Sequence, residues 1–310
     1  MEQGQLRDEI LRLKAKREAI ILAHNYQREE IQLLADYIGD SLDLARYSAK
    51  VKGKVVLFAG VDFMAQTAAM LNPDKTILIP DPDARCPMAA QLSPDMVIEA
   101  RRKHPGAAVV LYVNTLAETR AEADVVCTSA NAAQIVNALD EGEIIFGPDK
   151  NLAWYVQQRT DKKIIPLPDF GYCYVHRMFT PADILLKKER FPDAEVLVHP
   201  ECDPEVQKLA SHICSTSQML IRAKASPAKR FIIATEVGMV ERLKREFPGK
   251  EFIPALETAV CQQMKKHDLQ KIYESLRGMK HVVTVPPKIA ARARLATERM
   301  LELSGRATRD

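Results

Sequence analysis

The sequence lacks the features that would place a protein at a membrane or on nucleic acid. It contains no run of about 18 apolar residues, so we expect no membrane span. Its N-terminal stretch has no apolar segment like that of a signal peptide. The net charge is only +3, and basic and acidic residues are interspersed without a basic arm or an aromatic–basic stripe. We therefore expect a cytoplasmic protein that binds neither membranes nor nucleic acid.

Paired cysteines are also missing. The chain has six cysteines, but no two of them form a C-x-x-C motif. Because thiols stay reduced in the cytosol, the even number does not predict disulfides. Metal binding, catalysis and core packing remain as alternative roles for these residues.

What the sequence does contain is a regular alternation of short, β-branched apolar runs with helical patterns. This alternation predicts an α/β fold with mostly parallel sheets. Continuous apolar runs are typical of strands that are covered on both faces. Such runs occupy residues 19–24, 54–60, 75–81, 108–114, 143–149, 163–169, 195–201, 231–237 and 251–257.

The runs repeat with a period of 87 or 88 residues. Four sets of residues are each related by offsets of 88 and then 87: His24, Tyr112 and His199; Tyr26, Asn114 and Glu201; Ser41, Ser129 and Thr216; Phe58, Phe146 and Ile233. A register kept at four landmarks predicts three copies of one supersecondary unit. Three copies of this length favour a closed pseudo-threefold arrangement over an open array.

We divide the chain on this basis into a helix, three repeats and a second helix. The segments are 1–18 (N-terminal helix), 19–106, 107–193 and 194–281 (repeats), and 282–310 (C-terminal helix and tail). Each repeat is predicted to be a three-layer α/β/α unit that runs strand, helix, short strand, helix, strand, helix, strand and closing loop. The apolar stripe of the N-terminal helix comprises Leu6, Ile10, Leu11 and Leu13. We expect the C-terminal helix to begin at Pro286 and Pro287 and to end before Gly305.

Cys86, Cys173 and Cys261 hold equivalent places, because each follows the last apolar run of its repeat. If the repeats surround an axis, their closing loops face it together and the three thiols converge. Three convergent thiols can hold a [4Fe–4S] cluster with one open iron, bind zinc, or pack around the axis; we favour the cluster. An open iron can act as a Lewis acid. The remaining cysteines have no equivalents across the repeats and are expected to be free buried thiols: Cys127, Cys202 and Cys214.

Polar side chains follow the first strand of every repeat, as the sets that begin with His24 and Tyr26 show. Ligands of parallel α/β units bind at the carboxyl ends of the strands, so we expect one shared polar cavity. Ser41 and its two equivalents each precede a helix, either as N-caps or as part of an anion site at a helix N-terminus. His176, three residues after Cys173, either adds a donor to this cavity or lies in a surface loop.

Six motifs together resemble the quinolinate synthase family, and the resemblance covers essentially the whole chain. They are HNYQ at 24–27, GDSLDLA at 39–45, YVNT at 112–115, GYCYVH at 171–176, VHPEC at 198–202 and TAVCQQM at 258–264. The resemblance implies three α/β domains around a central cavity, with a [4Fe–4S] cluster held by Cys86, Cys173 and Cys261. It also implies condensation of iminoaspartate (iminosuccinate) with dihydroxyacetone phosphate to quinolinate, phosphate and water, in de novo NAD biosynthesis. L-aspartate oxidase or aspartate dehydrogenase would supply the iminoaspartate.

The same resemblance implies the site residues. Substrate contacts are implied for His24, Ser41, Tyr112, Val113, Asn114, Ser129, His176, His199, Pro200, Glu201 and Thr216. Catalytic roles are implied for Glu201, Tyr26, His199 and Tyr112, and we expect Glu201 to act as general base and Tyr26 as general acid. Two other functions would use the same three thiols: a non-catalytic iron–sulfur sensor, and a cluster-dependent hydro-lyase acting on a small dicarboxylic acid.

Overall fold

The computed structural model describes residues 3–306 and contains three four-stranded sheets in which every strand pair is parallel. The first sheet has the order β2 (Tyr37–Gly39), β1 (Ala19–His24), β3 (Val55–Ala59), β4 (Thr76–Leu78). The second has the order β6 (Val125–Cys127), β5 (Ala108–Tyr112), β7 (Glu143–Gly147), β8 (Lys163–Pro166). The third has the order β10 (His212–Ile213), β9 (Glu195–Val198), β11 (Arg230–Ala234), β12 (Glu251–Pro254). All nine predicted strands are therefore present, together with the short strand expected in each repeat.

The strand register is the same in all three sheets. Corresponding residue pairs are Leu22–Phe58, Val110–Phe146 and Leu197–Ile233. From one pair to the next, corresponding residues are separated by the offsets of 88 and then 87 that define the repeat. The predicted set of three equivalent α/β units is confirmed.

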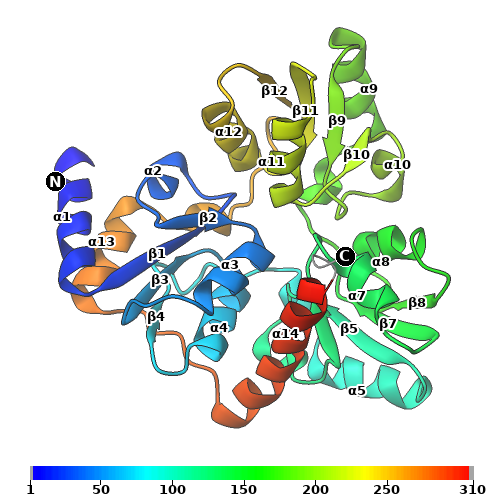
Figure 1. Cartoon of the computed structure of the whole chain (residues 1–310), viewed down its shortest axis with the longest axis horizontal. Coiled ribbons are helices and arrows are strands. Elements are labelled where there is room, and N and C mark those ends of the chain that lie inside the picture. The colour runs from blue at the N-terminus through cyan, green and yellow to red at the C-terminus, as the bar shows by residue number, and fades with distance from the viewer. Residues whose placement is uncertain (1–2, 307–310) are drawn as a thin grey trace.

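Helices cover both faces of each sheet, which gives the predicted three layers (Figure 1). The inner faces pack into one large apolar core, together with α3 (Ser41–Ser48), α4 (Asp62–Leu71), α7 (Ala132–Asn137), α8 (Lys150–Gln157), α11 (Thr216–Ala225) and α12 (Val237–Glu246). The other face of the first sheet is covered by α1 (Gln3–Lys16), α2 (Glu29–Gln32) and α13 (Leu269–Gly278). The second sheet is covered there by α5 (Pro94–Lys103) and α6 (Ala117–Arg120), and the third by α9 (Pro181–Arg190) and α10 (Pro204–Gln207). Alternate strand residues face the two layers, as the pleat requires.

The last helix of each repeat covers the sheet of the next repeat. Helix α5 packs on the second sheet and α9 on the third, where Ile184 contacts the cluster that contains Val196. Helix α13 returns to the first sheet and packs there beside α1. Because the third repeat passes its helix back to the first, the three units form a closed ring around a common centre (Figure 1).

Two details of the terminal helices differ from expectation. Leu11 is 43% exposed, whereas Leu6, Ile10 and Leu13 are buried. At about 100° per residue, Leu11 lies on a different side of α1 from the other three. Helix α14 (Pro287–Arg306) does not end before Gly305, because its last turn is held against α7. Asn131 Nδ2 donates to Ser304 Oγ there at 2.7 Å. The first two residues of the predicted N-terminal helix, and the tail from 307 to 310, lie outside the described residues.

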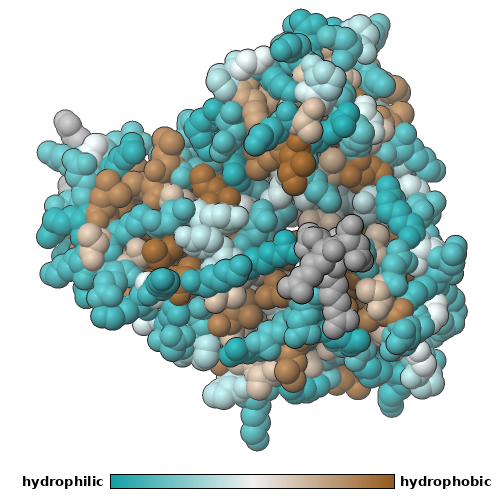
Figure 2. Space-filling model, viewed as in Figure 1, coloured by the Kyte–Doolittle hydropathy of each residue, from teal (hydrophilic) through white to brown (hydrophobic). Residues whose placement is uncertain are grey.

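The surface gives no sign of a membrane-spanning element. Among the helices in residues 3–306, none has both the length and the apolarity that crossing a bilayer requires. The face in Figure 2 is covered mainly by hydrophilic residues, and its hydrophobic residues are scattered.

Candidate active site

A cavity of about 750 Å³, counted out to its mouth, lies where the three units meet. The structure brings together thirteen of the predicted residues on its wall: His24, Tyr26, Ser41, Cys86, Tyr112, Asn114, Ser129, Cys173, His176, His199, Glu201, Thr216 and Cys261. Val113 and Pro200 do not line it: Val113 packs in the apolar core, and the Pro200 carbonyl accepts a hydrogen bond from Gln207.

The same turn follows the first strand in the first and third units. The backbone N–H of Tyr26 donates to Nδ1 of His24 at 3.2 Å, and that of Glu201 donates to Nδ1 of His199 at 3.3 Å. An Nδ1 atom that accepts a hydrogen bond leaves the proton of a neutral imidazole on Nε2. Both histidines therefore have an N–H donor left for a ligand.

Burial lowers the pKa of His24 and of His199 from 6.5 to about 3. Burial disfavours the charged imidazolium, and this effect outweighs the nearby Glu201 carboxylate, which acts in the opposite direction. Both rings are neutral at physiological pH. They can hydrogen-bond an anion but contribute no charge to its binding.

The two histidines should make the fold less stable in mild acid. Below pH 6.5 the unfolded chain takes up protons that the folded chain does not bind until about pH 3, so stability falls in this range. We expect the free energy of unfolding to be about 3 kcal/mol lower at about pH 5.5 than at about pH 7.5. Urea titration of the cluster-free protein measures this difference. The double variant His24→Asn/His199→Asn should lose most of the pH dependence, and an equal dependence in that variant would contradict this account.

Glu201 is the centre of a buried hydrogen-bond network. Tyr112 Oη donates to its Oε1 at 2.5 Å, and Nδ1 of His176 lies 2.7 Å from its Oε2. Burial by itself would raise the pKa of Glu201, but His176, His199 and the bond from Tyr112 lower it to about 2. Burial, followed by the Glu201 charge, raises the pKa of Tyr26 and Tyr112. The site therefore combines a carboxylate with two protonated phenols.

Thr235 is a site residue that the sequence analysis missed. Its Oγ1 lies 2.9 Å from Nε2 of His176 and 2.6 Å from Oη of Tyr26, so it joins two predicted site residues. It is 1% exposed and follows β11 directly. Its place directly after the third strand of a repeat could have pointed to it, as the place after the first strand pointed to His24, Tyr112 and His199.

The hydroxyls of Ser41, Ser129 and Thr216 are not N-caps, and that alternative is wrong. The N-caps of the three helices are Asp40, Asn131 and Ser215. Asp40 accepts from the backbone N–H groups of Leu42 and Asp43, so this carboxylate already occupies the N-terminus of α3. The three hydroxyls line the cavity instead, and the Thr216 hydroxyl accepts a hydrogen bond from Asn25 at 2.7 Å.

Asn114 has an unused acceptor at the cavity. Its Oδ1 atom is buried and has no hydrogen-bond partner within the described residues. The carbonyls on either side of it, of Val113 and Thr115, accept from the fully buried Arg120 guanidinium at 2.8 and 2.9 Å. Buried polar atoms normally have partners, so this oxygen indicates that a ligand with a donor group completes the site.

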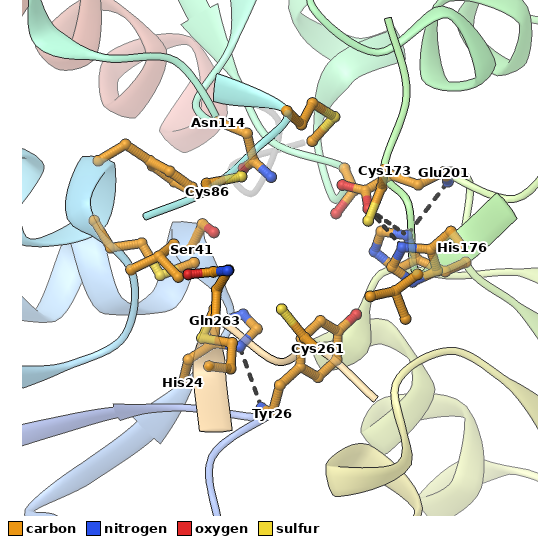
Figure 3. Close-up of a pocket in the computed structure, with 18 of the residues that line it drawn as sticks. His24, Tyr26, Ser41, Cys86, Asn114, Cys173, His176, Glu201, Cys261 and Gln263 are labelled. Carbon is orange, nitrogen blue, oxygen red and sulfur yellow. Dashed lines mark hydrogen bonds and ion pairs between the residues drawn. The ribbon is translucent and has the colours of Figure 1, made fainter. Parts of the chain in front are cut away.

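All six cysteines are free thiols. Cys86, Cys173 and Cys261 lie on different sides of the cavity with their sulfur atoms toward its centre (Figure 3). The other three are buried away from this wall, as predicted: Cys127, Cys202 and Cys214. Burial raises the pKa of the three cavity thiols, so a metal must displace their protons when it binds.

The three cavity thiols do not lie close enough together to share a single tetrahedral ion as they stand. One tetrahedral zinc ion would hold three sulfur atoms about 3.8 Å apart, given Zn–S bonds of about 2.3 Å. In the described part of the chain, a group whose ligand atoms all lie within 4.8 Å of one another is formed by Cys173, His176 and Glu201, not by the three thiols.

Comparisons with known proteins find relatives that match this chain over nearly its whole length. The family model described as quinolinate synthetase A protein matches residues 8–302. The quinolinate synthase of Methanothermobacter thermautotrophicus is 58% identical, over 97% of this chain and 99% of that protein. Those of Pyrococcus abyssi and Thermotoga maritima are 55% and 47% identical, each over 96% of this chain and over 99% of their own lengths.

Proposed function

Because the chain belongs to the quinolinate synthase family, we propose that it condenses iminoaspartate with dihydroxyacetone phosphate to quinolinate, phosphate and water. One observation carries the proposal: residues from all three units meet in a single cavity, where a buried acid–base network lies beside three thiols. A carboxylate, two phenols and neutral histidine donors suit a condensation that needs several proton transfers and binds substrates with carboxylate and phosphate groups.

We propose Cys86, Cys173 and Cys261 as the ligands of a [4Fe–4S] cluster. Their position on the cavity wall supports this assignment. When bound, such a cluster supplies a Lewis acid for a substrate oxygen, because three thiolates leave one iron without a protein ligand.

A chain of close contacts suggests a route for protons in the network. His176 lies between Glu201 and Thr235, with its Nδ1 2.7 Å from Glu201 Oε2 and its Nε2 2.9 Å from Thr235 Oγ1. Thr235 Oγ1 is in turn 2.6 Å from Tyr26 Oη. The chain of contacts therefore runs from Tyr26 to Glu201. Tyr26 is therefore placed to exchange a proton with the substrate, and His176 with Glu201 to store it.

The Thr235 hydroxyl should be needed for this transfer. Thr235→Val keeps the shape of the side chain but removes both hydrogen bonds, and we expect kcat to fall roughly 10- to 100-fold with KM nearly unchanged. Steady-state kinetics with both substrates measures the effect. Thr235→Ser restores the hydroxyl and should recover most of the activity. If the valine and serine variants were equally active, Thr235 would have no part in proton transfer.

The activity itself is tested with the anaerobically purified chain after reconstitution with iron and sulfide. Incubation with iminoaspartate and dihydroxyacetone phosphate should give equal amounts of quinolinate and phosphate. A protein that binds both substrates without forming product would instead be a binding protein or sensor. A protein that dehydrates a small dicarboxylic acid without needing the triose phosphate would be a hydro-lyase.

The setting of the reaction follows from the same proposal. We propose a cytoplasmic enzyme whose iminoaspartate is supplied by L-aspartate oxidase or aspartate dehydrogenase.

A further inference from the structure

Three acidic residues repeat at nearly the same interval as the cysteines, which are 87 and 88 residues apart. Asp62, Asp149 and Glu236 are each 87 residues apart. Asp62 is the first residue of α4, and the other two are the N-caps of α8 and α12. Each therefore begins the helix that follows the third strand of its unit.

Each carboxylate accepts two kinds of backbone hydrogen bond. One comes from the first turn of its own helix: Phe63 at 2.9 Å, Leu152 at 2.7 Å and Gly238 at 2.7 Å. The other comes from the backbone N–H of the cysteine of the same unit: Cys86 at 3.0 Å, Cys173 at 3.2 Å and Cys261 at 3.2 Å. The same pair of bonds thus occurs in all three units.

Helix capping alone does not explain these acids. Helices α5, α9 and α13 are capped by Ser93, Thr180 and Asp268, which make no bond to a cysteine. Asp149 and Glu236 are fully buried, and a buried carboxylate is unfavourable unless its hydrogen bonds are satisfied. An acid at the equivalent place of all three units, fully buried in two of them, indicates a role beyond the helix.

The third acid is also connected to the catalytic network. Lys265 Nζ lies 3.1 Å from Oε1 of Glu236 and donates to the backbone carbonyl of Tyr26 at 2.6 Å. The loop that carries Cys261 is thereby joined to the turn that carries Tyr26. A shift of this cysteine would be felt at the proposed general acid.

We propose that Asp62, Asp149 and Glu236 are positioning residues that hold the three cysteines in the orientation needed to bind the cluster. The inference rests on the proposed function, because it assumes that these cysteines are the ligands. A hydrogen bond to the backbone N–H of a cysteine restrains the peptide plane before it. This restraint narrows the directions that the Cα–Cβ bond can take and favours a sulfur that faces the cavity before iron binds. Partners of this kind, one step removed from the metal, typically change metal affinity by about 10- to 100-fold.

The three acids differ in a way that gives an internal test. Asp62 accepts both bonds at a single atom, Oδ1. Asp149 uses Oδ1 for its helix and Oδ2 for Cys173, and Glu236 likewise divides the two bonds between its two oxygens. An amide keeps one oxygen and replaces the other by an NH₂ donor. Asp62→Asn can therefore keep both bonds, whereas Asp149→Asn must place a donor against an N–H.

The experiment compares iron retention in the reconstituted full-length chain. Wild type, Asp62→Asn, Asp149→Asn, Glu236→Gln and Asp268→Asn are loaded anaerobically, assayed for iron and sulfide, and transferred to a ferrous chelator. Asp268→Asn serves as the control for the same acid-to-amide change at a helix cap away from the cysteines. We expect wild type, Asp62→Asn and Asp268→Asn to release iron at similar rates, and Asp149→Asn and Glu236→Gln to release it at least about tenfold faster. Circular dichroism establishes that each variant is folded, and either of the last two carries the test if the other fails to fold.

The outcomes separate this inference from the function on which it rests. Equal release from all folded variants would overturn the positioning role while leaving the cluster in place. Rapid release from Asp62→Asn as well would overturn the hydrogen-bond basis, because that variant keeps its acceptor. A wild-type chain that binds no iron would overturn the proposed cofactor, and the inference with it.

Discussion

Replacing Cys173 by alanine is expected to remove the bound iron and to lower quinolinate formation by at least about 10³-fold. The loop around this residue follows β8, and the side chain is only partly buried, so the fold should remain intact. Two thiolates cannot replace three, and the Lewis acid would be lost together with the third ligand. Iron analysis, the absorption spectrum and the coupled quinolinate assay measure the effect.

Cys214→Ala is the matched control. Cys214 is a buried free thiol that does not line the cavity. Its removal should leave the iron content and the absorption spectrum unchanged. Wild-type amounts of iron in the Cys173 variant would contradict the assignment of this residue as a ligand.

Glu201→Gln is expected to lower kcat by about 10²- to 10⁴-fold while changing substrate affinity little. The amide is close to the carboxylate in size and can still accept from Tyr112, but it cannot hold a transferred proton. Because the pKa of Glu201 is about 2, the carboxylate remains ionised throughout the neutral and mildly acidic range. Its own titration should therefore give no acidic limb in the pH profile of the wild-type enzyme.

Single-turnover kinetics and equilibrium binding distinguish the two effects of this substitution. Glu195→Gln is a suitable control, because Glu195 belongs to the same unit but pairs with Arg222 at 2.8 Å outside the cavity. It should keep wild-type kcat. Unchanged turnover in Glu201→Gln, with substrate still bound, would exclude Glu201 from acid–base catalysis.

Some sequence predictions fail because two adjacent residues are equally suited to cap a helix, and residue type alone does not say which of them does so. Asp40 and Ser41 are both good helix caps, and Ser215 and Thr216 are too. The structure uses the first residue of each pair as the cap, and the hydroxyl of the second lines the cavity, where Asp40 also reaches the wall. Only the position of the helix relative to the other units decides which of the two faces the ligand.

Thr235 and the acids at the cysteine loops illustrate a different limit. Thr235 is 209 residues from Tyr26 and 59 from His176, and its role exists only because three units place these side chains together. The three acids could have been found from the sequence, since they share the interval of 87 residues. Their contact with the cysteine backbone appears only in the fold.

The sequence by itself determined the α/β class, the three equivalent units and the equivalence of Cys86, Cys173 and Cys261. These follow from local apolar patterning and from a register that can be counted along the chain. Tertiary structure decided which hydroxyls face the cavity, how Thr235 joins Tyr26 to His176, and how the last helix of each repeat closes the ring. These features depend on distances of a few ångströms between segments that are far apart in the chain, and no local pattern encodes such distances.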